Sequence, residues 1–251
     1  MIIEYDGTNY VGWQTQLNGL AVQEVIEKAI SEVTGETLRI EGSGRTDSGV
    51  HAVAQVAHFD TDARMAADKF AIAINTHLPS DIRILYSEEA PTDFHSRFSA
   101  KRKEYRYAIQ LGPHARVFES RTSLHVHYDL DIQLMEHAAR QFLGEHDFRA
   151  FMSTGTTIEN TIRTIYKSEW SRIGDLLLYN VAGNGFLYNM VRIMVGTMLE
   201  IGMHKSETNC IVSAFETLDR NYAGSTAPAH GLTLYRVSYD GFDTEEILSK
   251  I

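Results

Sequence analysis

A polar, glycine-rich stretch separates two apolar runs near the start of the chain: Gly42-Ser43-Gly44-Arg45-Thr46-Asp47-Ser48-Gly49-Val50-His51. We expect the flanking runs, residues 38–40 and 52–59, to be strands, because each is apolar and bounded by turn residues. Glycines allow backbone turns that other residues resist, but a simple turn between two strands needs only about two to five residues. Two interpretations stay open. The stretch is a polar turn in which Arg45 and Asp47 are solvated or paired, or it is a rigid loop that holds Asp47 at the mouth of a cleft.

The composition indicates an ordered globular protein of one or two domains. The chain has 251 residues, and 43% of them are hydrophobic, which is enough for a substantial core. Cys210 is the only cysteine, which excludes a disulfide within the chain and a zinc site built from cysteines. No basic-then-apolar leader and no apolar run of bilayer length is present. We therefore expect a soluble, cytoplasmic protein with no membrane partner.

The net charge of the chain is negative, but it is unevenly distributed. A net charge of −10 argues against indiscriminate nucleic-acid binding. Residues 83–121, however, contain eight basic and five acidic residues, a local excess of +3. This segment forms either a local basic face or an evenly mixed, solvated surface, and charge alone does not decide between the two.

The periodicity of apolar residues predicts a mixed α+β chain. The predicted helices span residues 22–33, 65–77, 132–143, 186–201 and 207–218. The predicted strands span residues 2–5, 38–40, 52–59, 82–86, 104–110, 162–170, 176–182 and 232–239. The order strand, helix, strand, strand, helix, strand occurs twice, which is typical of a split βαβ, or ferredoxin-like, unit. We therefore expect two such halves, residues 1–98 and 99–251, forming a broad antiparallel sheet with a central groove.

Arg192 lies within a predicted helix that is apolar on most sides. A buried arginine generally needs an anionic partner, because a desolvated charge is costly. It either extends to the surface or a nearby carboxylate, or it reaches across the groove to Asp47. The second arrangement would fix the rotamer of Asp47 and keep its carboxyl group ionised.

Aromatic and polar side chains alternate with cations in two further segments. Residues 102–107 read Arg-Lys-Glu-Tyr-Arg-Tyr, so Tyr105 stands among cations on a predicted strand. This pattern suits stacking on a nucleobase together with phosphate contacts, and it equally suits a core tyrosine with cations on the solvated face. Residues 12–16, which include Gln14, are rich in aromatic and amide groups and fit either packing or nucleotide contact.

Several standard sites are absent from the sequence. We find no P-loop, no dinucleotide-binding glycine motif, no HExxH and no GxSxG. His125 and His127 fall on one strand face, but no third ligand accompanies them. We therefore predict no metal.

Taken together, these segments resemble the TruA family of tRNA pseudouridine synthases. The resemblance covers nearly the whole chain and is most specific at residues 44–51, Gly-Arg-Thr-Asp-Ser-Gly-Val-His. Further matching segments are residues 4–8, 12–14, 22–23, 93–100, 105–107, 144–148, 189–192 and 227–232. Thr15 departs from the pattern, because an arginine is common there, and this removes one expected RNA contact.

The resemblance implies isomerisation of uridine to pseudouridine in the anticodon stem-loop of tRNA, at tRNA positions 38–40. It further implies a homodimer, no cofactor, and a central cleft that holds the RNA and the active site. It assigns Asp47 as the catalytic residue, Tyr105 as the residue that stacks on the target base, and Arg192 as the partner of Asp47. Arg45 is implied to help flip the target nucleotide, and Val191 to lie in the substrate site. The expected RNA-backbone contacts are Arg97, Lys101, Arg102, Lys103, Arg106 and Gln14.

The chemistry of this isomerisation agrees with the residues available. An N1–C1′ bond breaks and a C5–C1′ bond forms, with no net redox change, and glycosidic chemistry of this kind uses a carboxylate. Asp47 attacks C1′, adds to C6 or removes a ribose proton, and the sequence does not choose among these routes. Two rival hypotheses are a non-catalytic RNA-binding protein on the same scaffold and a hydrolase that uses Asp47.

Overall fold

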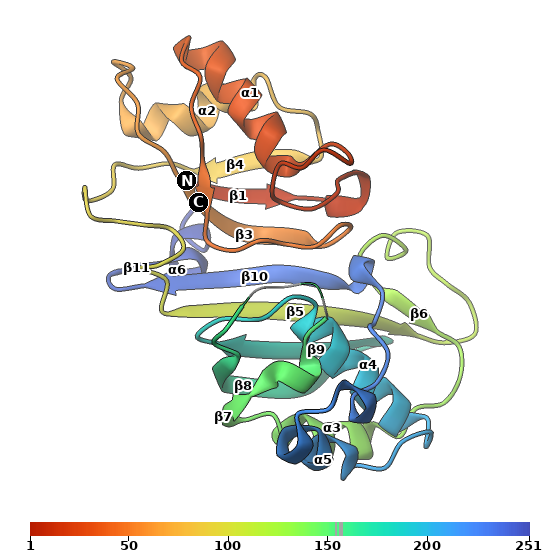
Figure 1. The fold of residues 1–251 in the computed structure, drawn as a ribbon. Coiled ribbons are helices and arrows are strands. Elements are labelled where there is room, and N and C mark those ends of the chain that lie inside the picture. Colours follow the sequence, from red (N-terminus) through yellow and green to blue (C-terminus); the bar gives the residue numbers. More distant parts are fainter. Residues whose placement is uncertain (154, 156–157) are drawn as a thin grey trace. The chain divides into compact units, whose positions relative to one another are not determined.

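The computed structural model describes residues 1–153, 155 and 158–251, and the chain forms two compact units (Figure 1). The first unit consists of residues 1–103 together with 233–251, and the second of residues 104–232. The closing strand, which we assigned to the C-terminal half, therefore packs within the first unit. Each unit combines strands with helices, and the prediction of a mixed α+β chain is confirmed.

The sheet of the first unit is built around the short strand β1, Ile2–Tyr5. On one side β1 pairs antiparallel with β4, Ile82–Tyr86, and on the other with β3, His51–His58. β3 continues the sheet to β10, Leu232–Tyr239, and this pairing is parallel. The smaller strands are β2, Glu41–Gly42, which pairs with β3, and β11, Phe242–Asp243, which pairs with β10.

Two helices cover one face of this sheet (Figure 1). α1, Val22–Thr34, ends at Gly35 in the left-handed conformation (φ 75°), as predicted. α2, Phe70–Asn75, follows a 3-10 turn at Ala67–Lys69 and is shorter than the predicted helix over 65–77. The fully buried side chains of these strands and helices include Ile2, Ile3, Ile26, Ile30, Ile74 and Ile82.

The predicted strand over residues 38–40 is wrong. The N–H of Ile40 donates to Glu27 Oε1 at 3.1 Å, and its carbonyl accepts from Gln23 Nε2 at 3.0 Å. Both partners are side chains of α1, so these backbone groups are satisfied without a neighbouring strand. The ladder begins one residue later, at Glu41.

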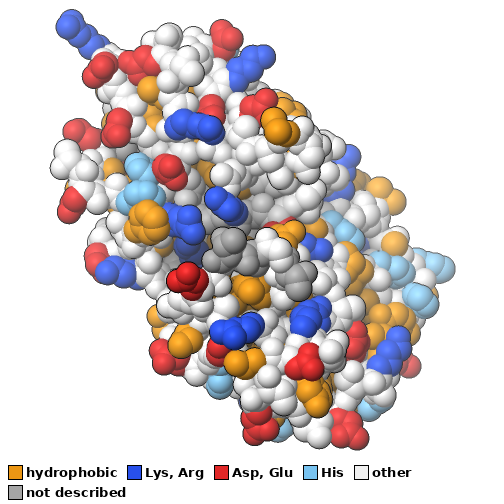
Figure 2. All heavy atoms as spheres, in the orientation of Figure 1, with side chains coloured by type: hydrophobic (Ala, Val, Ile, Leu, Met, Phe, Trp, Pro, Cys, Tyr) orange, Lys and Arg blue, Asp and Glu red, His pale blue; other side chains and the backbone are white. Residues whose placement is uncertain are grey.

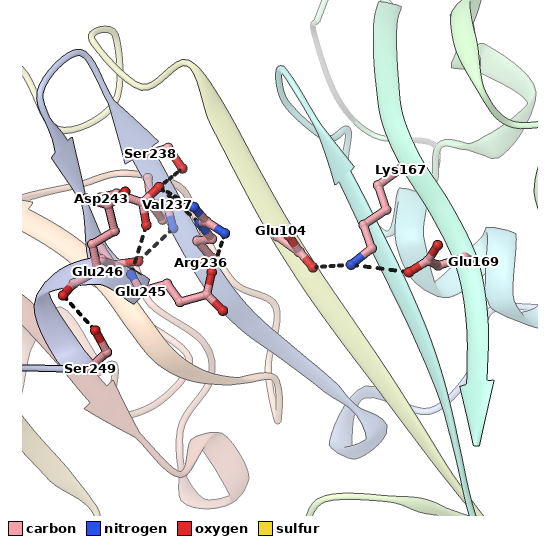
Figure 3. A network of polar contacts seen from close by, with 11 residues as sticks. Glu104, Lys167, Glu169, Arg236, Val237, Ser238, Asp243, Glu245, Glu246 and Ser249 are labelled. Carbon is pink, nitrogen blue, oxygen red and sulfur yellow. Dashed lines mark hydrogen bonds and ion pairs between the residues drawn. The ribbon is translucent and has the colours of Figure 1, made fainter. Parts of the chain in front are cut away.

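The C-terminal segment of the first unit is fixed by a polar network (Figure 3). Arg236 donates to Asp243 Oδ2 from Nε at 3.0 Å and from Nη2 at 2.8 Å, and Nη1 contacts Glu245. Ser238 Oγ donates to the same carboxylate oxygen at 2.6 Å. Asp243 also caps the short helix α6, Thr244–Leu248, which the sequence analysis did not predict.

The sheet of the second unit has the order β5-β9-β8-β7. β5 spans Arg102–Leu111, β7 Gly144–Asp147, β8 Ile162–Ile173 and β9 Leu176–Gly183. A further strand, β6, Leu124–Val126, runs parallel to β5. Together with the β3–β10 pair, it corrects the expectation of a wholly antiparallel arrangement, because both parallel partners reach their places through long connections.

Three helices accompany this sheet, and α3 packs against α4 and β8. They are α3, Ile132–Arg140, α4, Met190–Gly202, and α5, Cys210–Thr217. The predicted helix over 186–201 starts only at Met190, because Asn189 before it has a left-handed φ of 60°. The predicted helix over 132–143 ends at Arg140, since the chain turns at Gly144 (φ 98°) into the unpredicted β7. Within the described residues, no helix is long and apolar enough to cross a membrane.

Candidate active site

The loop of residues 42–51 is held by the chain segment that precedes α1. Gly12 and Asp47 form an isolated antiparallel bridge, and the N–H of Trp13 donates to Thr46 O at 3.1 Å. The same segment accepts from the first turn of α1, because the N–H of Val22 donates to Gly12 O at 3.1 Å. The backbone of Asp47 is therefore connected to the start of a helix, which gives the loop a defined conformation.

Side-chain contacts beneath the loop fix it further. Thr46 Oγ1 lies 2.8 Å from the Tyr5 hydroxyl, and burial raises the pKa of Tyr5, which keeps this hydroxyl neutral. Ser43 Oγ donates to Gln55 Oε1 at 2.7 Å, and Gln55 Nε2 donates to Gly44 O at 2.8 Å. These partners lie under the loop and support it from the sheet.

The side chains of the loop divide between its two sides. Ser43, Thr46 and Val50 are buried, Arg45 is exposed and Asp47 is half-buried. The two charged groups thus stand at or near the surface, on a backbone anchored from below.

Glycine is required near Asp47 for two different physical reasons. Gly12 has a φ of 109°, and a Cβ built on it would lie 2.4 Å from Thr46 O. Gly42 does not have a positive φ, but a Cβ there would lie 2.5 Å from Nε1 of the Trp13 ring. Close approach therefore accounts for Gly42, whereas the turn at Gly49 (φ 77°) matches the conformational freedom we expected.

Lys103 contacts the loop itself. Its Nζ donates to the carbonyl of Ser43, and it lies 3.5 Å from the position that a Cβ on Gly44 would occupy. We predicted Lys103 as an RNA-backbone contact. In the structure its ammonium group supports the entrance of the Asp47 loop, which sequence spacing does not reveal, and the RNA contact stays a prediction.

The second unit positions Tyr105 on β5. Its side chain is only 7% exposed, and its ring packs edge-on against Phe186, with 5.1 Å between centroids and 83° between planes. Tyr107, two residues on, is fully buried and donates its hydroxyl to Pro228 O at 2.8 Å. The expected alternation along β5 is present, and the stacking role of Tyr105 stays a prediction.

Arg192 is oriented by two acceptors of its own unit. Nε donates to Ala227 O and Nη1 to Asn189 Oδ1, each at 2.7 Å. Asn189 is itself held, because its Nδ2 donates to Ser153 Oγ at 2.8 Å. The side chain of Val191 is 3% exposed and packs into the unit. Sequence reasoning missed Asn189, although its spacing of three residues from Arg192 was visible.

The remaining predicted RNA contacts differ in exposure. Arg97 and Gln14 are exposed, whereas Arg102 is half-buried. Lys101 pairs with Asp240 at 3.0 Å, and Arg106 Nε donates to Asn180 Oδ1 at 2.9 Å. Figure 2 shows both Lys or Arg and Asp or Glu side chains on the face it draws.

The two histidines considered as metal ligands lie close together. The rings of His125 and His127 are 6.2 Å apart, and His125 Nε2 lies 2.8 Å from Gly112 O. Among the residues that the structure describes, no three His, Cys, Asp or Glu side chains gather in an arrangement suited to a metal ion.

The predicted site residues thus fall into two groups. The first unit carries Arg45, Asp47 and Lys103 at one loop, and the second carries Tyr105 and Arg192. A direct Asp47–Arg192 pair would join residues of different units, and it stays a prediction.

Comparison with known proteins decides the family. The model of the tRNA pseudouridine synthase family matches residues 1–99 and 138–240. The chain belongs to this family. It is 50% identical to tRNA pseudouridine synthase A of Ruminiclostridium cellulolyticum, covering 95% of this chain and 98% of that protein. It is 46% identical to the enzyme of the same name from Geobacillus sp. strain WCH70 (95% and 96%) and 45% identical to that of Brevibacillus brevis (95% and 98%). The pseudouridine synthase match includes the whole Asp47 loop and the segment around Arg192.

Proposed function

We propose that this chain isomerises uridine to pseudouridine in the anticodon stem-loop of tRNA, at tRNA positions 38–40, with Asp47 as the nucleophile. Family membership makes the chain an isomerase that forms pseudouridine in tRNA. The observation that carries the role of Asp47 is its loop, in which a half-buried carboxylate is bridged through the backbone to Gly12 beside an exposed Arg45.

Asp47 is suited to this chemistry because it combines a fixed backbone with a carboxylate that is partly withdrawn from water. Such a group can attack C1′, add to C6 or take a ribose proton, and each route leaves uracil detached or loosened before C5 joins C1′. We propose that Tyr105 stacks on this uracil and that Val191 lies against it. We further propose that Arg192 pairs with Asp47 and keeps it ionised, since an adjacent cation favours the charged form of a carboxylate.

RNA binding completes the proposal. A uridine inside a stem must leave its stack before it reaches Asp47, and the exposed Arg45 beside this residue is suited to fill the space it vacates. Arg97 and residues 101–103 and 106 would contact phosphates, so the affinity for tRNA should fall as the salt concentration rises.

The architecture and assembly belong to the same proposal. In the first unit the strands lie in the order β4-β1-β3-β10, and the two-residue β2 pairs with β3 off this path. The neighbouring β4, β1 and β3, with α1 and α2 between them in sequence, support a ferredoxin-like half. We propose a second such half in the remainder of the chain, a central cleft for the RNA, and a cytoplasmic homodimer.

A tritium-release assay tests the reaction and the role of Asp47. tRNA labelled with tritium at uridine C5 loses the label to water when C5 joins C1′. We expect release by the wild-type protein and none by Asp47→Asn, with tRNA binding kept. Asp68→Asn is the matched control, because Asp68 is 67% exposed and pairs with the adjacent Lys69, and it should release tritium like the wild type.

The assay also separates the rival hypotheses. Wild-type binding of tRNA without any release would support a non-catalytic RNA-binding protein. Unchanged release by Asp47→Asn would remove this residue from the mechanism.

A further inference from the structure

An exposed aromatic cluster lies at residues 94–98 of the first unit, outside the Asp47 loop. Phe98 is 75% exposed, so most of its ring is open to solvent. The His95 ring lies beside it, with 4.3 Å between centroids and 41° between planes. The His58 ring follows, 4.8 Å from that of His95. The cluster is therefore a row of rings whose outermost member faces solvent.

A cation lies next to the exposed ring. Arg97 Cζ is 5.5 Å from the centroid of Phe98, within the range of a cation–π contact. Arg97 is exposed as well, so its guanidinium can move from the ring to a bound phosphate at small cost. An aromatic ring beside a guanidinium suits the binding of an unpaired nucleotide, because the base stacks on the ring and the phosphate contacts the cation.

Hydrogen bonds hold this cluster in place. His95 Nδ1 accepts from the N–H groups of Arg97 at 3.1 Å and Phe98 at 3.4 Å, so the ring carries its proton on Nε2. The turn is closed by the N–H of Ser99, which donates to His95 O at 2.9 Å. The exposed ring therefore stands on a preformed turn, and little ordering would be required when a ligand binds.

The turn is tied to the strand that leads into the Asp47 loop. Ser96 is fully buried, and its Oγ donates to Glu41 O at 2.6 Å. The Tyr239 hydroxyl donates to Ser96 O at 2.6 Å, and His58 Nδ1 lies 3.0 Å from Ser96 Oγ. Glu41 immediately precedes Gly42, so the cluster and the loop share one anchor within the same unit.

We propose that Phe98, with His95 behind it and Arg97 beside it, is a stacking platform for one unpaired nucleotide of the RNA substrate. This inference rests on the proposed action on tRNA and adds a contact outside the reacting base. The exposed face of Phe98 takes the base, and Arg97 takes the adjoining phosphate. The platform would hold a loop nucleotide at a fixed place relative to Asp47. Ser96 ties the turn that carries Phe98 to Glu41, and Glu41 immediately precedes the Asp47 loop.

Binding measurements with two RNAs test the platform. The probes are a short RNA stem-loop and a blunt RNA duplex of equal length, measured by fluorescence anisotropy at one salt concentration. Phe98→Ala should weaken binding of the stem-loop roughly tenfold, the effect of losing one base–aromatic stack, and leave duplex binding unchanged. Phe98→Trp should bind the stem-loop as the wild type does, because it keeps an aromatic face.

Two control variants sharpen the result. Phe118→Ala removes a phenylalanine that is 96% exposed and should change neither affinity. Phe98→Leu keeps apolar bulk without an aromatic face, and it should weaken stem-loop binding as Phe98→Ala does. Wild-type affinity of Phe98→Leu for the stem-loop would show that the RNA needs no aromatic face at this position, and would overturn the platform. Thermal unfolding should be nearly unchanged in every Phe98 variant, since this side chain is largely exposed.

The platform and the proposed function fail separately. Wild-type tritium release combined with undiminished stem-loop binding by Phe98→Ala would overturn the platform and leave the isomerase intact. A tenfold loss of affinity by Phe98→Ala that is confined to the stem-loop would support the platform, even if the wild-type protein released no tritium. The absence of release by the wild type would overturn the proposed reaction and not the platform.

Discussion

Replacing Gly12 by alanine tests whether the Asp47 loop is held by the segment before α1. Two costs add at this position. A φ of 109° lies outside the wells available to alanine and costs about 1–3 kcal/mol. The new Cβ would lie 2.4 Å from Thr46 O, and since this atom is backbone, the loop must shift, at about 1–3 kcal/mol. We therefore expect Gly12→Ala to lower the free energy of unfolding by about 2–6 kcal/mol.

Gly35→Ala is the matched control in the same unit. Gly35 also has a positive φ, 75°, but nothing lies within 4 Å of its added Cβ. Only the backbone cost of about 1–2 kcal/mol remains. The difference between the two variants, measured by urea unfolding, gives the cost of the contact between Gly12 and the loop to within about 1 kcal/mol, the difference between the two backbone costs.

We expect Gly12→Ala to reduce catalysis more than Gly35→Ala, as it does stability. Gly12 is bridged to Asp47, so a shift of the loop moves the carboxylate, and a misplacement of about 1 Å can cost a hundredfold in rate. We expect Gly12→Ala to lower kcat for tritium release about a hundredfold at a temperature where it stays folded, and Gly35→Ala to keep the wild-type value. If Gly12→Ala loses no more stability than Gly35→Ala and keeps its kcat, the loop is not held in the way described.

Substitutions at two further positions test the supporting contacts. Asn189→Gly keeps the left-handed backbone but removes the acceptor for Arg192. We therefore expect its kcat to fall about ten- to a hundredfold, with KM little changed. Asn189→Asp keeps that acceptor and should keep most of the activity. Burial raises the pKa of Asp243, but hydrogen bonds from Arg236 and Ser238 outweigh burial and leave the pKa below its usual 3.8. Its contribution is present above pH 3.8 and is lost as the pH falls through the lower folded-state pKa. Asp243→Asn should therefore cost about 1.5–3 kcal/mol at neutral pH and flatten the stability curve at acidic pH, and an unchanged curve in urea unfolding would contradict this.

Local periodicity predicted the elements whose partners are set by their own apolar faces. The helix ended by Gly35 and the strands over 82–86 and 232–239 were predicted closely, because the apolar pattern within each segment is enough to specify its secondary structure. Residues 38–40 were mispredicted since their backbone partners are side chains of α1, which no local pattern encodes. The parallel pairing of β10 with β3 was likewise invisible, because it joins segments far apart in sequence.

The sequence could predict only those candidate site residues that lie within a short, recognisable motif. Asp47 was predicted as the catalytic residue from the resemblance of residues 44–51 to the family pattern, whereas its charge and the neighbouring glycines alone left a polar turn open. The support from Gly12 and Lys103 was not found, since it depends on a close backbone approach and on a lysine that turns toward a carbonyl. Asn189 was missed because its role follows from a φ of 60°, which places its amide beside Arg192.

The position of β10 sets an order of assembly during synthesis on the ribosome. β3 lies between β1 and β10, and β10 comes from the last part of the chain. β2 pairs with β3 only at Ala57 and His58, so the edge of β3 at His51 and Ala52 stays open until residues 233–239 have left the exit tunnel. Residues 104–232 form a continuous unit that is complete before then. The nascent chain therefore exposes an unpaired strand edge throughout most of translation, and such edges are sites of misassociation. Factors that bind nascent chains should matter more for the first unit, although it is made first.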